Sequence, residues 1–216
     1  MKMKASVNGD SLTMKRLLVL GLLVLVLMIG LAPIVEGHYL DAVIRSSWAR
    51  VETNIDGEFS VGEWDDATLL DFLAEEPSNP LEAYGYFKND QRYLYIALDV
   101  VGDITENLGD ASTISFDTEH DAAYTDGHDD TFGIEVPSTR HIVVGELCCE
   151  PFDPTLPLHE GLAGSWGFGP SPNSGEDHRI YEYSIPLALI MALPGEVIGF
   201  GIDGGAHWGI YDRDID

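Results

Sequence analysis

Residues 83–101 read AYGYFKNDQRYLYIALDVV, and this stretch carries the strongest indication of the fold. Two runs rich in tyrosine, isoleucine and valine flank the turn-forming residues 89–91, which is typical of a β-hairpin. In the second run, aliphatic side chains at 94, 96, 98 and 100 alternate with tyrosine, alanine and aspartate. This period of two predicts a strand with one aliphatic face, as in a β-sandwich.

Short strands are expected throughout the chain after residue 37. Clusters of Gly, Pro, Asp and Asn separate five further candidates, at 112–116, 131–136, 141–146, 179–185 and 197–202. The pattern favours an all-β fold over alternating β and α units. Two exceptions are a predicted short helix at 186–193, opened by proline and closed by Pro-Gly, and a predicted long loop at 148–175.

The first 37 residues have the order of a secretory signal peptide. Lys15 and Arg16 precede an uncharged apolar run at 17–31, and Val35-Glu36-Gly37 offers a weak cleavage site. Met14 is an alternative start. The apolar run falls slightly short of the roughly 17–25 residues of a spanning helix, so a retained N-terminal membrane anchor is the alternative. Either way the protein is expected to be secreted or at the cell surface, with a linker at 38–52 and one domain at 53–216.

The chain of 216 residues is strongly acidic, with 11 Lys and Arg against 37 Asp and Glu, a formal charge of −26. Removing residues 1–37 takes away four basic and two acidic residues, so 7 basic and 35 acidic remain, a charge of −28. This balance argues against nucleic-acid binding, which needs clustered Lys and Arg. Such self-repulsion requires screening or cations. A high-salt environment and bound calcium both account for it.

Five motifs, in order over about 53–211, resemble domains similar to family 9 carbohydrate-binding modules. They are the IDG–W–A opening at 55–67, the ND–LYIA strand pair at 87–97, FDT–D at 116–121, DDTF at 129–132, and the IPL–G–IGF close at 183–200. The resemblance implies an antiparallel β-sandwich, immunoglobulin-like or jelly-roll-like, with about nine to eleven strands. It also implies a carbohydrate or polysaccharide ligand, often with bound calcium, and service as an accessory to a secreted glycoside hydrolase.

The densest acidic cluster predicts a calcium site. Alternating carboxylates around a glycine supply the hard oxygens that calcium prefers, at Asp117, Glu119, Asp121, Asp126, Asp129 and Asp130. The spacing is not that of an EF-hand. The alternatives are a solvated acidic loop, and a transition metal assisted by His120 and His128.

Aromatic residues are the candidates for sugar contact, because a flat ring matches the C–H face of a pyranose. Trp64 is expected in the core. Trp166, in a glycine-rich stretch, and Trp208 are predicted to form the apolar platform, with Arg92 as a partner for sugar hydroxyls. The vicinal pair Cys148-Cys149 is predicted to be a local disulfide staple; a dimer bridge or two free thiols are the alternatives.

No catalytic motif supports an enzyme. Gly-x-Ser-x-Gly, His-Glu-x-x-His and a phosphate-binding loop are all missing from the sequence. The prediction is a non-catalytic, calcium-stabilised binding module. The main alternative is an acidic cell-surface structural or adhesion domain without a sugar ligand. A third hypothesis, which the resemblance implies through haem-binding members of the wider superfamily, is haem binding with Met191 or a histidine as axial ligand.

Overall fold

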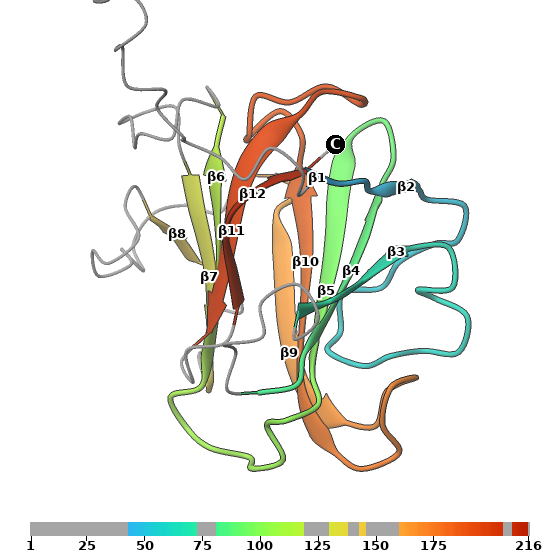
Figure 1. The fold of residues 1–216 in the computed structure, drawn as a ribbon, viewed down its shortest axis with the longest axis vertical. Coiled ribbons are helices and arrows are strands. Elements are labelled where there is room, and N and C mark those ends of the chain that lie inside the picture. Colours follow the sequence, from blue (N-terminus) through green and yellow to red (C-terminus); the bar gives the residue numbers. More distant parts are fainter. Residues whose placement is uncertain are drawn as a thin grey trace, which may run out of the picture. The chain divides into compact units, whose positions relative to one another are not determined.

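Two facing β-sheets form the domain (Figure 1). A computed structural model describes residues 43–72, 81–118, 130–137, 143–145, 160–204 and 209–215, all within one compact unit, Gly37–Asp216. The first sheet runs in the order β1 (Val43–Ile44), β12 (Gly209–Ile215), β11 (Ile198–Gly204), β6 (Ala111–Asp117), β7 (Asp130–Glu135), β8 (Val143–Gly145). The second runs in the order β2 (Ser47–Trp48), β4 (Tyr84–Asn89), β5 (Tyr93–Val100), β10 (His178–Pro186), β9 (Ala163–Gly169), with β3 (Thr68–Asp71) also paired to β4.

The all-β prediction is therefore confirmed, with twelve strands in the described ranges against the nine to eleven expected. The hairpin predicted at 83–101 is β4 and β5, and the five other predicted strands correspond to β6, β7, β8, β10 and β11. Most neighbours are antiparallel, but β1 pairs with β12 and β2 with β4 in parallel. Both short parallel strands lie in the range predicted as a linker. Nowhere in the described ranges is a helix long and apolar enough for a membrane crossing.

The core lies between the inner faces of the two sheets. The predicted alternation in β5 holds, since Leu94, Ile96, Leu98 and Val100 are buried in this core. Aromatic rings join the sheets: the rings of Phe87 in β4 and Phe200 in β11 meet edge to face, with centroids 5.9 Å apart. The Tyr183 hydroxyl in β10 donates to the Ser112 carbonyl in β6 at 3.0 Å. Its hydrogen bond satisfies a fully buried hydroxyl and fixes the spacing of the sheets.

The helix predicted at 186–193 is wrong. Turns follow β10 instead, with Leu189 N donating to Pro186 O at 2.9 Å and Ala192 N to Leu187 O at 3.0 Å. Neither spacing is the four-residue step of an α-helix. Met191 adopts a left-handed conformation, with φ of 47°, which ends any helical turn at that point.

The loop predicted at 148–175 is wrong over its second half, where β9 lies. The strand AGSWGFG is rich in glycine and poor in β-branched residues, so local propensity does not reveal it. Pairing with β10 along seven register positions supplies what propensity lacks. The last residues of the chain, which have no predicted partner, form β12 against β11 and β1.

Candidate binding site

A hollow of about 580 Å³ lies on the outer face of the second sheet. Its floor is an aromatic cluster of Phe59, Trp64 and Tyr86, with ring centroids 5.1 to 6.3 Å apart. The walls come from two loops and from the edge strand β3: Ser60, Val61, Gly62, Asp65, Ala67, Leu69, Pro170, Ser171 and Pro172. The volume and the mainly apolar lining are those of a small-ligand site.

Glu182 fixes the loop that carries the first wall. It lies on the outer side of β10, fully buried, and its carboxylate accepts three hydrogen bonds from residues 56–64. The backbone N–H groups of Asp56 and Gly57 donate to Oε2 at 3.0 and 2.8 Å, and Trp64 Nε1 donates to Oε1 at 3.0 Å. The IDG–W motif is thus explained physically, because its backbone donors and its indole converge on one carboxylate.

Two glycines let this loop lie directly on the sheet. Gly57 has a φ of 86°, a conformation that favours glycine. A Cβ at Gly167 in β9 would lie only 1.9 Å from the Gly57 carbonyl oxygen. The glycine-rich sequence of β9 therefore serves close backbone approach rather than exposure of a ring.

Lys88 holds the far end of the same loop. This lysine, which is the only one after residue 37, is fully buried in β4. Its Nζ donates to Glu63 O at 2.6 Å and to Asp66 Oδ1 at 3.0 Å, and lies 5.0 Å from the centre of the Trp64 ring. These partners compensate the buried charge of Lys88. Loss of one of them would leave the ammonium group incompletely paired in a site away from water.

Asp99 fixes the second wall. Its buried carboxylate, on the outer side of β5, accepts hydrogen bonds from Ser171 Oγ at 2.6 Å and from Asn173 Nδ2 at 2.7 Å. Asn173 Nδ2 is also 2.8 Å from the Tyr86 hydroxyl in the floor, and His178 Nε2 makes a short contact with Asp99. Both walls are thus anchored to buried carboxylates, so the hollow is preformed.

Burial shifts the protonation of these groups. Burial raises the pKa of Glu182 to about 7, against the lowering effect of its three hydrogen bonds. The pKa of Glu63 is raised for the same reason. For His178, burial lowers the pKa, but the hydrogen bonds to Asp99 and to the Glu176 carbonyl, together with the charges of Asp99 and Asp177, outweigh it, so the pKa lies above its usual value.

Ser171, Asp99 and His178 do not form a catalytic triad. Ser171 and His178 both bond to Asp99, so the serine hydroxyl is not paired with the imidazole that would act as its base. Asp99 and His178 are also fully buried. The cluster is therefore suited to holding structure rather than to nucleophilic attack.

The structure does not bring the predicted sugar contacts Trp166 and Arg92 together. Trp166 packs partly buried against the main core, with the Arg179 guanidinium 5.7 Å from its ring centre. Arg92 is exposed in the turn between β4 and β5, over the Tyr93 ring. In the sheet, Trp166 pairs with Tyr181, whereas Tyr93, the neighbour of Arg92, pairs with Pro186. Tyr181 and Pro186 are five residues apart along β10, which is a distance of about 17 Å.

Several other predicted residues lie outside the described ranges. These are Trp208, the cysteine pair at 148–149, and four of the six predicted calcium ligands: Glu119, Asp121, Asp126 and Asp129. The other two ligands lie at one end of the β6–β7 hairpin, because Phe116 pairs with Asp130 and Asp117 follows. Within the described ranges no three acidic, histidine or cysteine side chains are grouped to hold a metal. The calcium, platform and disulfide assignments stay predictions.

Trp64 is buried, as predicted for a core residue, whereas three anchors of the hollow were not predicted from the sequence. Trp64 is 4% exposed, as expected for a buried ring, although it also underlies the hollow. Glu182, Lys88 and Asp99 were missed as anchors. The alternation of the strands does contain a trace of them, because all three are charged residues on the outer side of strands whose other side is apolar. Only the position of the covering loops shows that this outer side is buried.

The two facing sheets define a β-sandwich, and comparison with known proteins shows which ones share this fold. No family model and no curated protein matches the chain at a significant level. Two solved structures of a family 9 carbohydrate-binding module from Caldicellulosiruptor kristjanssonii share the fold. The complex with cellotriose has a TM-score of 0.51 at 14% identity, covering 80% of this chain and 83% of that one. The complex with glucose has a TM-score of 0.50 at 17% identity, covering 77% and 82%. The fold implied by the motif resemblance is therefore confirmed.

Proposed function

We propose that the protein is an exported, non-catalytic carbohydrate-binding module that serves a secreted glycoside hydrolase. The observation that carries the proposal is the shared fold with two sugar-bound modules over about four fifths of the chain. Carbohydrate chemistry is compatible with the acidic surface, since neutral sugars need apolar faces and hydrogen bonds rather than positive charge.

The hollow on the second sheet offers these contacts among the described residues. Phe59 is half-buried, and Val61 and Leu69 are exposed at the opening, so apolar surface is available to the C–H face of a sugar ring. Ser60 and Asp65, both exposed, line the same opening and can hydrogen-bond hydroxyl groups. Because both walls are anchored, little ordering cost would accompany binding.

Titration calorimetry with cellotriose and with glucose tests the proposal, followed by a wider panel of soluble glycans. Phe59→Ala and Val61→Asp should weaken binding at least about tenfold if the hollow is the site. Leu108→Ala is the matched control, since Leu108 is an exposed aliphatic residue outside the hollow. Unchanged thermal melting of Val61→Asp excludes simple misfolding as the cause.

Trp208→Ala distinguishes the predicted platform from the hollow. Loss of binding in this variant, with Val61→Asp unaffected, would move the sugar site to Trp208 and leave the function standing. Heat signals that stay at the dilution baseline for every glycan would refute carbohydrate binding. The acidic structural or adhesion domain would then be the better description.

We also propose that calcium stabilises the domain through the carboxylates at 117–130. Asp117 and Asp130 support this, because the strand register places them at one end of a hairpin from which the other predicted ligands continue. Millimolar calcium at fixed ionic strength should raise the melting temperature, and Asp130→Asn should reduce the rise. An equal rise with magnesium or with sodium alone would show that the carboxylates are only screened.

A further inference from the structure

Exposed apolar side chains gather at the end of the sandwich where the chain enters it. Five of the nine exposed large apolar residues in the described ranges lie on two segments, 48–51 and 191–197: Trp48, Val51, Met191, Leu193 and Val197. Leu193 is 66% and Met191 51% exposed. We call this end of the domain the entry end.

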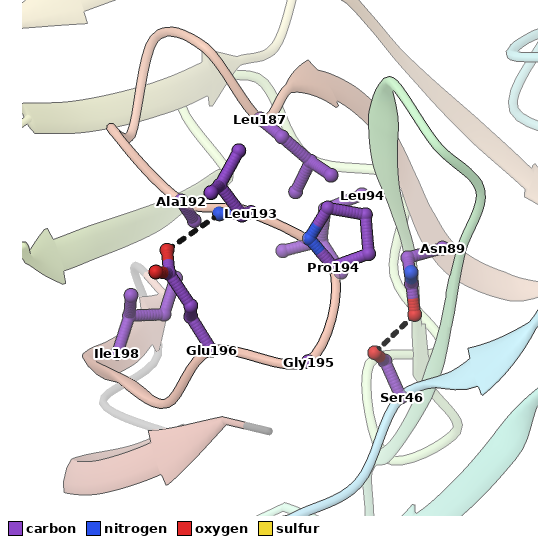
Figure 2. A pocket seen from close by; sticks show the side chains of 10 residues that line it. All are labelled: Ser46, Asn89, Leu94, Leu187, Ala192, Leu193, Pro194, Gly195, Glu196 and Ile198. Carbon is purple, nitrogen blue, oxygen red and sulfur yellow. Dashed lines mark hydrogen bonds between the residues drawn. The ribbon is translucent and has the colours of Figure 1, made fainter.

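Asn89 connects the two segments, because Trp48 pairs with it in the sheet and the loop 187–197 lies beside it. Figure 2 shows the loop after β10, with Leu193, Pro194 and Glu196, close to Ser46 and to Asn89 at the end of β4. Ser46 Oγ donates to Asn89 Oδ1 at 2.6 Å, and Leu187 N donates to Arg92 O at 2.8 Å. The chain entry, the β4–β5 turn and the loop 187–197 therefore form one continuous surface.

The exposed positive charge of the described residues lies on the same surface. Of the arginines and lysines whose side chains are described, Lys88 and Arg179 are fully buried. The three exposed ones are Arg45, Arg50 and Arg92, and all three adjoin the contacts that define the entry end. Glu52 and Glu196 are exposed nearby, and Glu196 accepts from Leu193 N at 2.7 Å. In a chain of charge −26, such a gathering of arginines is unusual.

The chain itself supplies the reason for a lipid partner. The apolar run at 17–31 connects to Val43 through only eleven residues, 32–42. Fully extended, this connection reaches at most about 40 Å. A membrane that holds the run would thus be within reach of the entry end. Exposed Trp, Leu and Met with flanking arginines are the composition that lies at a bilayer interface.

We propose that the entry end rests on an anionic lipid bilayer, with Trp48, Met191 and Leu193 at the interfacial layer and the arginines on lipid phosphates. The inference adds a membrane-facing surface to the domain and does not depend on sugar binding. The hollow on the outer face of the second sheet shares no lining residue with the pocket at the entry end.

Brominated lipids, which quench nearby indole fluorescence, test this contact with the full chain in phosphatidylglycerol vesicles. Leu193→Trp places a new indole at the entry end. Leu108→Trp is the matched control, because Leu108 is 80% exposed and belongs to the connection from β5 to β6, which lies at the other end of β5 from the β4–β5 turn (Figure 1). The loss of emission for Leu193→Trp should be at least about twofold that for Leu108→Trp.

A second arm tests the arginines. Arg45→Gln with Arg92→Gln should reduce the quenching of Leu193→Trp in phosphatidylglycerol, as should molar salt, and phosphatidylcholine should quench less from the outset. Equal quenching of the two tryptophan variants would overturn the proposal. The proposal would also be overturned if the protein formed a concentration-dependent dimer in which the indole of Leu193→Trp was protected from the quencher. The surface would then be a contact with a second copy of the chain.

Discussion

Replacing Glu182 with glutamine tests the idea that a buried carboxylate latches the IDG–W loop to the sheet. In the wild-type protein the native state holds a proton on Glu182 up to a pKa of about 7, whereas the ordinary value is 4.5. Between these values the native state binds more protons than the unfolded state. The contribution of Glu182 to the free energy of unfolding is therefore fully present below pH 4.5 and is lost as the pH rises through 7.

The magnitude follows from the same two values. One proton and about 1.4 kcal/mol per pH unit give a total of about 3 kcal/mol, of which about 2.5 kcal/mol falls between pH 5 and pH 8. Glutamine cannot ionise, so Glu182→Gln loses this component. Its own cost, an amide facing the donors of Gly57 or Trp64, is about 1–3 kcal/mol and does not change with pH.

Urea unfolding of both proteins at pH 5 and pH 8, in constant high salt, isolates the effect. The stability difference between wild type and variant should shift by about 2.5 kcal/mol in favour of glutamine at pH 8. Other carboxylates titrate in both proteins. Glu63, whose negative charge raises the pKa of Glu182, can be removed as Glu63→Gln in both. Glu106→Gln, at an exposed position, is the control. Parallel pH profiles would refute the reasoning.

Three further predictions concern the same loop and its anchors. Gly167→Ala should destabilise the domain by about 3 kcal/mol or more, because its Cβ would meet the Gly57 carbonyl; denaturant unfolding measures this. Lys88→Met should cost about 3–5 kcal/mol by removing the cation that pairs with Asp66 and donates to the Glu63 carbonyl, whereas Arg92→Met, at an exposed position, should cost little in the same assay. Tyr86→Phe should cost about 1 kcal/mol, the hydrogen bond from Asn173, as a small drop in melting temperature.

The predictable part of the fold is the part whose local pattern agrees with its environment. Strands β4 and β5 alternate cleanly, because one side meets the core and the other carries tyrosines and charges. β9 gave no such signal, since its glycines are required by the Gly57 backbone and not by strand propensity. The turns at 187–193 contain good helix formers, yet Met191 at φ 47° shows that packing of Ile190 and Leu187 into the core overrides propensity.

The candidate site was less predictable, for a related reason. Trp166 was chosen from its glycine-rich neighbours, but strand alternation turns its ring toward the core. The hollow depends on contacts between residues far apart in the chain, such as Trp64 with Glu182 and Asn173 with Tyr86. No spacing rule links positions 118 or 87 residues apart. Only the topology, which brings β4, β5 and β10 side by side, makes these pairs meet.

The distribution of the few cations divides the electrostatics of this protein into two parts. Lys88 and Arg179 are fully buried and pair with Asp66 and Asp110 at 3.0 and 2.8 Å, so salt in the solvent screens these contacts little. The carboxylates at the surface face few compensating cations and repel one another, and salt does screen that repulsion. Added salt should therefore stabilise the native state without loosening the loop anchors. A melting temperature that falls with added salt would show that the buried ion pairs, and not the surface, dominate the balance.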